Sequence, residues 1–139
     1  MKIMSVDLGL ARTGIAACDP LEMLASPVKV IFEKNEKRLI ESVADEAKLM
    51  GAQLIVVGLP KNMDGTSGER ATECERIAGE ISAACGIETV MWDERCTTVS
   101  AHNALNVTNT RGKKRKAVVD AVAAVMILES YLNYRRNNK

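Results

Sequence analysis

The chain has 139 residues, of which 47% are hydrophobic and 27% charged, and its formal net charge is +1. This composition excludes a disordered chain and is typical of a soluble globular protein, so we expect residues 1–139 to form one domain with its own core. No apolar run reaches the roughly 18 residues that a membrane-spanning helix needs, and no signal peptide precedes the first predicted strand. We therefore expect a cytoplasmic protein without a membrane partner.

The hydrophobic pattern predicts an opening hairpin followed by alternating helices and strands. The expected strands are 1–7, 13–18, 28–32, 54–57 and 88–92, and the expected longer helices are 36–50, 69–85 and 116–134. Thr97 or Thr98 is expected to cap a short helix that ends near Leu105. Loops are expected at 58–68 and 107–115. The order strand–strand–strand–helix–strand–helix–strand–helix indicates an α/β domain with a mixed sheet.

Asp120 is the most informative residue of the last helix, because it is the only polar residue between Ala117 and Leu128. A helix that is apolar all round is expected to be buried. A carboxylate there costs several kcal/mol unless it is paired, hydrogen-bonded or bound to a metal ion. The alternative is a carboxylate bonded to nearby backbone near the start of the helix.

Two further acidic positions follow predicted strands. Asp7 ends the first strand and opens a turn that contains Gly9, and Asp93 and Glu94 follow the strand at 88–92. Binding sites of α/β sheets gather at the carboxyl ends of strands. Either position could instead be an ordinary turn or a solvated strand end, with Arg95 as an ion-pair partner. Side chains alternate along a strand, so only one of Asp93 and Glu94 can face a given site.

Carboxylates on two strand ends and one helix could converge on one point, and this predicts a metal site. Hard oxygen ligands suit Mg²⁺ or Mn²⁺, and two such ions can activate water against a phosphodiester. His102 is the only histidine, and the cysteines form no Cys-x-x-Cys pair, so we expect no zinc site and reduced thiols. The cysteines are Cys18, Cys74, Cys85 and Cys96.

Four segments, in order along the chain, resemble the YqgF/RuvX family of RNase H-like proteins. They are Asp7-Leu-Gly-Leu-Ala-Arg-Thr-Gly14, Val57-Gly-Leu-Pro-Lys-Asn-Met-Asp-Gly65, Trp92-Asp-Glu-Arg-Cys-Thr-Thr98 and Val119-Asp-Ala-Val-Ala-Ala124. The resemblance implies a five-stranded mixed sheet flanked by helices. It also implies a nuclease that matures the 5′ end of precursor 16S rRNA, in a family also proposed to resolve Holliday junctions.

The resemblance assigns the catalytic and metal-binding positions to Asp7, Glu94 and Asp120. It matches Arg12 to a first-turn arginine that could contact a phosphate. The spacing alone does not choose between Asp93 and Glu94.

Basic charge is concentrated beside the helix that carries Asp120. Residues 111–139 hold eight Lys or Arg against two acidic residues, whereas residues 1–110 hold eleven against sixteen. This asymmetry favours a polyanionic partner contacted from one side. We expect Lys113, Lys114, Arg115 and Lys116 to contact phosphates of a nucleic acid, although a charge run is often only a solvated loop. The loop from Pro60 to Gly68 is interpreted as a wall of the site.

Three other functions remain open at this stage. A Holliday junction resolvase would use the same carboxylates on branched DNA and would need a two-fold dimer, so a monomer or a homodimer are both compatible with the sequence. A non-catalytic RNA-binding assembly factor could keep the fold. An actin-like ATPase shares the strand-Asp-x-Gly turn, but it needs a second lobe for which 139 residues leave no room.

Overall fold

A computed structural model of the chain describes residues 1–9, 11–60, 68–93 and 112–137, with the backbone alone for 112–121. Its elements in chain order are β1 (Ile3–Asp7), β2 (Arg12–Cys18), β3 (Ala25–Phe32), α1 (Glu36–Met50), β4 (Leu54–Leu59), α2 (Glu69–Cys85), β5 (Thr89–Asp93) and α4 (Gly112–Asn137). The predicted order of strands and longer helices is confirmed. The short helix expected from Thr97 or Thr98 lies outside the described residues.

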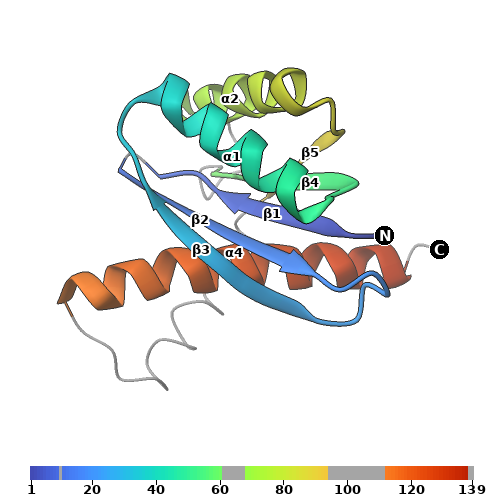
Figure 1. Cartoon of the computed structure of the whole chain (residues 1–139). Helices are drawn as coiled ribbons and strands as arrows, with labels where there is room; N and C mark the ends of the chain where they lie inside the picture. Colours follow the sequence, from blue (N-terminus) through green and yellow to red (C-terminus); the bar gives the residue numbers. More distant parts are fainter. Residues whose placement is uncertain (10, 61–67, 94–111, 138–139) are drawn as a thin grey trace.

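The strands form one five-stranded mixed sheet in the order β3-β2-β1-β4-β5 (Figure 1). β2 pairs antiparallel with β1 and β3, whereas β4 pairs parallel with β1 and β5. The predicted opening hairpin and mixed sheet are therefore confirmed. Because β1, β4 and β5 run in the same direction, their carboxyl ends meet at one edge of the sheet.

Helices cover both faces of this sheet, with α1 and α2 on one side and α4 on the other (Figure 1). Met4 and Val6 of β1 pack with α1 and α2, whereas Ile3 packs with α4. This alternation is what a strand buried on both faces requires. β4 shows the same property, because all six of its residues are buried.

Local sequence signals set the ends of α1 and α2, whose predicted bounds are confirmed. The Asn35 side chain accepts a hydrogen bond from the Arg38 backbone N–H at 3.0 Å, which caps the start of α1. Gly51 and Gly86 follow the two helices with φ of 69° and 72°. Only glycine adopts this left-handed conformation without strain, so each glycine ends its helix.

Several strand ends differ from the sequence prediction. β3 begins at Ala25 rather than at residue 28, and it includes Pro27. A proline is tolerated there because β3 is an edge strand with one unpaired side. β4 continues through Gly58 and Leu59, which were expected in a loop, because both still pair with β5.

α4 departs from the prediction in two ways. It begins at Gly112 rather than at Lys116, so the backbone of Lys113, Lys114 and Arg115 is helical and not a loop. Lysine and arginine are good helix formers, which the interpretation as a charged loop underestimated. The expectation that α4 is buried all round was also wrong for its described side chains. Ala124 and Ile127 are buried, but Val125 and Met126 are partly exposed.

An ionic cluster around Glu22 fixes the direction of α4. The Arg135 Nε donates to the Glu22 carboxylate at 2.6 Å, and the Met1 amino group lies 3.3 Å from the same carboxylate. The amino group also donates to the Pro20 carbonyl at 2.7 Å. The end of α4 therefore lies beside the start of the chain, and α4 runs antiparallel to β1.

None of the described helices is long and apolar enough to span a membrane.

Replacing Glu22 with Gln should make stability less dependent on acid. Hydrogen bonding from Arg135 is the main reason that the pKa of Glu22 lies below its ordinary value of 4.5. A depressed folded-state pKa contributes stability above the unfolded value and loses it as pH falls through the folded value. Glu22→Gln should therefore cost about 1 kcal/mol at neutral pH and little in strong acid.

Urea unfolding of the unchanged protein and of Glu22→Gln, from neutral pH down to strong acid, measures how the free energy of unfolding of each depends on pH. Glu41→Gln, an exposed residue of α1, is the matched control. A penalty for Glu22→Gln that stays constant down to strong acid would show that the carboxylate contributes no charge-dependent stability.

Candidate active site

Asp7 ends β1, the central strand of the sheet, and is half-buried. The Ser5 hydroxyl donates a hydrogen bond to the Ala124 carbonyl of α4 at 2.7 Å, so Ser5 lies on the α4 face. Side chains two residues apart on a strand project from the same face. Asp7 therefore projects from the α4 face, at the edge where the parallel strands end.

The backbone of Asp120 lies on α4 at about the level of Asp7. Asp120 precedes Ala124 by four residues, which is about 6 Å along a helix. Asp7 follows Ser5 by two residues, which is about 7 Å along a strand. Because α4 and β1 run antiparallel, these two steps lead in the same direction from the Ser5–Ala124 hydrogen bond.

Asp93 is the last residue of β5, and the residues before it show from which face of the sheet it projects. Trp92 packs on the α4 side, where its indole Nε1 donates to the Ser130 hydroxyl at 3.1 Å. Met91, one residue earlier, packs against the core under α1 and α2. Alternation therefore puts Asp93 on the α1/α2 face, opposite to Asp7. Glu94 lies outside the described residues.

Gly9 shapes the turn that follows Asp7. A Cβ added at Gly9 would overlap the backbone carbonyl oxygen of Arg12. Backbone lies this close only where the residue has no side chain. The glycine of the Asp7-Leu-Gly segment is therefore required for the chain to leave β1 and enter β2.

Arg70 holds the same turn from α2 and was not singled out by the sequence analysis. Its Nη2 donates to the Leu8 carbonyl at 2.9 Å, and its Nη1 donates to Glu73 at 3.1 Å. One feature of the sequence could have indicated the role of Arg70. A cation in the first turn of a helix is disfavoured by the helix dipole, so an arginine there indicates a partner elsewhere.

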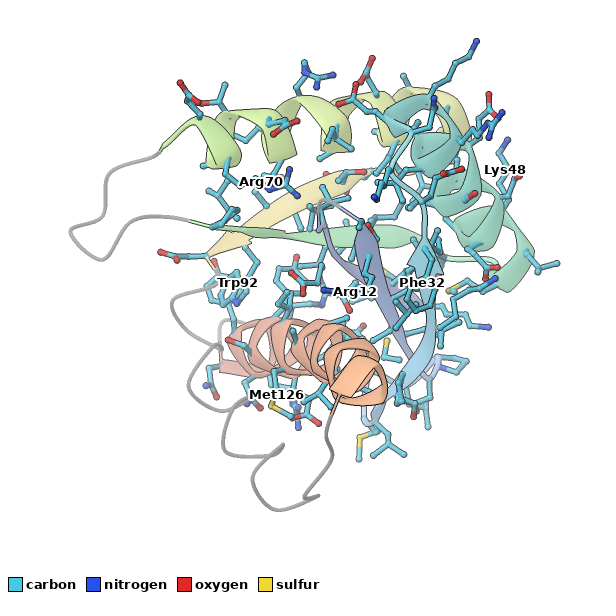
Figure 2. All side chains as sticks on the ribbon, turned by 90° about the vertical axis from the view of Figure 1, so that its left-hand side faces the viewer. Arg12, Phe32, Lys48, Arg70, Trp92 and Met126 are labelled. Atoms are coloured by element: carbon cyan, nitrogen blue, oxygen red, sulfur yellow. The ribbon has the colours of Figure 1, made fainter. Side chains whose placement is uncertain are left out.

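Arg12 is the first residue of β2 and is half-buried. Figure 2 shows it between the sheet and α4, on the side of the molecule where α4 begins. Gly14, two residues later, pairs directly with Asp7. Arg12 and Asp7 therefore belong to neighbouring strands and project from the same face.

The remaining predicted site residues lie on α4 and in the 58–68 segment. Lys113, Lys114, Arg115 and Lys116 occupy the first turns of α4, at the end of the helix that also carries Asp120. Of the segment from Pro60 to Gly68, residues 61–67 lie outside the described part, so its expected role as a wall of the site stays a prediction.

No group of three or more His, Cys, Asp or Glu side chains within the described part of the chain could hold a metal ion. Two of the three predicted ligands, Glu94 and the side chain of Asp120, are not in that part. The predicted set consists of carboxylates only, which fits Mg²⁺ or Mn²⁺ by its chemistry.

The chain matches known families and proteins over nearly its full length. The family model described as RuvX, Holliday junction resolvase, matches residues 1–134. A relative from Carboxydothermus hydrogenoformans is 38% identical over 138 residues, which cover 99% of this chain and 100% of that protein. A relative from Listeria monocytogenes is 41% identical and covers 96% of this chain and 98% of its own. Both are provisionally named pre-16S rRNA nucleases.

Solved structures share the fold at low sequence identity. Thermus thermophilus RuvC in complex with a Holliday junction substrate aligns with a TM-score of 0.60 and 15% identity, over 98% of this chain and 96% of that one. The fowlpox virus resolvase in complex with Holliday junction DNA gives a TM-score of 0.63 and 12% identity, over 97% and 99%. These similarities confirm the RNase H-like fold.

Replacing Arg70 with Met should loosen the turn after Asp7. The substitution removes the charged donor to the Leu8 carbonyl, and a lost hydrogen bond of this kind costs about 1 kcal/mol. Amide hydrogen exchange at Leu8 and Gly9 should become faster, because the turn opens more often. Urea unfolding and exchange measured by NMR test both effects.

Arg76→Met is the matched control, because Arg76 lies on the same helix and bonds to the carboxylates of Glu36 and Glu80. Equal exchange at Leu8 in both variants would show that Arg70 does not hold the turn.

Proposed function

Because the chain belongs to the RuvX family, we propose that it is a metal-dependent nuclease whose catalytic carboxylates are Asp7, Glu94 and Asp120. The observation that carries this proposal is that the backbone of Asp120 on α4 lies at about the same level as Asp7 at the end of β1. The Ser5–Ala124 hydrogen bond at 2.7 Å fixes that alignment. We further propose that residues 1–139 act as one nuclease domain.

Alternation along β5 supports Glu94 over Asp93 as the third carboxylate. Val90 and Trp92 pack on the α4 side of β5, so Asp93 projects from the other face, whereas Asp7 projects from the α4 face. Asp93 is therefore not placed to join Asp7. This leaves Glu94, which lies outside the described residues, as the proposed third carboxylate.

Three carboxylates fit one or two Mg²⁺ or Mn²⁺ ions, which would supply activation of a water molecule and stabilisation of the leaving oxygen when bound. Asp7, Glu94 and Asp120 would hold the ions. Clustered carboxylates repel one another without a cation, so the site is poised to bind one. Arg12, on the strand next to Asp7, would hold a substrate phosphate through its guanidinium.

We propose RNA as the substrate, cut at the 5′ end of precursor 16S rRNA, because the relatives that match the whole chain carry that provisional name. The basic residues Lys113–Lys116 at the start of α4 would contact the phosphate backbone. Such contacts position a nucleic acid without reading its bases.

A second candidate is a resolvase of branched DNA, favoured by the description of the matching family and by the fold shared with two resolvases. Resolving a four-way junction symmetrically requires two active sites related by a two-fold axis. A cleavage assay that compares precursor 16S rRNA with a four-way DNA junction separates the two candidates. Sedimentation of the free chain then decides between a monomer and a homodimer.

A non-catalytic RNA-binding factor would behave differently in the same assay. It would bind the precursor RNA but leave it uncut in Mg²⁺ and in Mn²⁺. That outcome would reject the nuclease proposal.

Removing any one of the three carboxylates should abolish most cleavage and weaken metal binding. Asp7→Asn, Glu94→Gln and Asp120→Asn each remove one charge with little change of shape, so stability in metal-free buffer should stay close to that of the unchanged protein. Asp93→Asn is the matched control and should keep its activity, because Asp93 projects from the opposite face.

Cleavage assays and Mn²⁺ titrations followed by electron paramagnetic resonance measure the two effects. Activity should disappear in excess EDTA. Full activity in EDTA, or equal losses in Asp93→Asn and Glu94→Gln, would contradict the proposed site.

Replacing Lys113 and Lys114 with Ala should flatten the salt dependence of RNA binding. Each lost phosphate contact should reduce the slope of log affinity against log salt by roughly 0.7 for a single strand. The effect should be similar for different base sequences, because phosphates carry no sequence information. Stability should change little, since alanine is also a good helix former.

Titration of labelled RNA at several salt concentrations gives the slope. A double variant of Lys37 and Lys48 makes the same change of charge on α1, which covers the other face of the sheet, and serves as the control. An equal slope for the two double variants would show that Lys113 and Lys114 are ordinary solvated surface residues.

A further inference from the structure

The aromatic residues of the chain are few, and all but one gather in a single cluster. The sequence contains one Trp, two Tyr and one Phe. The Trp92 ring centroid lies 5.5 Å from that of Tyr131 and 5.3 Å from that of Tyr134. Phe32 stands apart on β3, with 67% of its surface exposed. A single exposed apolar side chain is ordinary, so the argument depends on where Phe32 lies.

Phe32 lies on the same face and at the same edge of the sheet as Asp7. It is the last residue of β3 and pairs with Arg12, the first residue of β2. Ile31, one residue earlier, is buried in the core under α1 and α2, so Phe32 projects from the α4 face. Figure 2 shows Phe32 and Arg12 next to each other at the level between the two helical layers.

One strand, β2, lies between the strands that carry Phe32 and Asp7. β1, β2 and β3 are consecutive in the sheet, so Phe32 lies two strand spacings, roughly 10 Å, across from Asp7. Gly14, which pairs with Asp7, has no side chain on that face. Arg12 of β2 projects from this same face and has a long side chain.

From this arrangement we infer that Phe32 is a stacking platform for an unpaired base of the nucleic acid whose phosphate is held beside Asp7. The inference rests on the proposed function and adds the class of substrate. An aromatic ring stacks on any base, because every base has a π-face, and a neighbouring cation retains the phosphate. Bases inside a duplex already stack on one another and cannot be reached in this way.

The substrate is therefore a nucleic acid with unpaired nucleotides next to the cleaved bond. A continuous duplex would leave the ring without a partner. Because stacking tolerates sequence, Phe32 contributes a preference for single strands and no preference for particular bases.

Binding of short single-stranded oligonucleotides tests the inference, with RNA and DNA of one sequence and the corresponding duplexes as ligands. The full chain is used with Asp7→Asn, in buffer free of divalent ions, so that no cleavage interferes. Phe32→Ala should weaken single-strand binding roughly tenfold, the scale of one lost stacking contact. Duplex affinity should change little. Phe32→Trp should restore single-strand affinity, whereas Phe32→Leu should not.

Leu49→Ala is the matched control, because Leu49 is 83% exposed at the end of α1. It should leave all affinities unchanged, and urea unfolding should show that every variant remains folded. Unchanged single-strand affinity in Phe32→Ala, an equal loss on duplexes, or full rescue by Leu would overturn the inference.

The chain with Asp7 intact is assayed separately for cleavage in Mn²⁺. Single-strand binding that depends on Phe32 without any cleavage would reject the nuclease and keep the platform. Cleavage together with binding that does not depend on Phe32 would reject the stacking platform and keep the nuclease. A chain that neither binds nor cuts would overturn both.

Discussion

The packing of α4 across the sheet is the constraint on which the candidate site depends. Its buried side chains, among them Ile127 and Leu128, fill the core on that face, and the Ser5–Ala124 hydrogen bond fixes where along the helix the contact occurs. The ionic cluster around Glu22 fixes the other end of the helix. A buried hydroxyl without its acceptor would be costly, so this alignment of helix and strand is strongly preferred over neighbouring ones. The positions of Asp7 and Asp120 follow from it.

Two glycines flank the end of β1 on the α4 face. Gly14 pairs with Asp7 on one side, and Gly58 of the neighbouring strand pairs with Trp92 on the other. Both glycines are buried. The turn after Asp7 is held by Gly9 against the Arg12 carbonyl and by Arg70 from α2.

The proposed carboxylates would not distinguish RNA from DNA, because both polymers present the same phosphodiester group. Discrimination has to come from the surfaces beside the site. On one side these are the basic first turns of α4, which favour any polyanion. On the other side is Phe32, whose proposed role as a stacking platform would favour unpaired bases.

The sequence by itself determined the α/β order, the bounds of α1 and α2 and the opening hairpin, and it singled out Asp7 and Asp120 as candidate site residues. Periodicity, helix caps and an isolated carboxylate in an apolar run are local signals, so they can be read without a fold. Only the tertiary structure showed that Asp93 projects away from the face of Asp7, that Arg70 reaches the Leu8 carbonyl and that Phe32 lies beside Arg12. These relations join residues far apart in the sequence, 62 positions in the case of Arg70 and Leu8, and pairing between distant strands and helices decides them. The start of α4 was misjudged because a run of charges is typical of a solvated loop, although lysine and arginine are also good helix formers, and the local pattern does not separate the two.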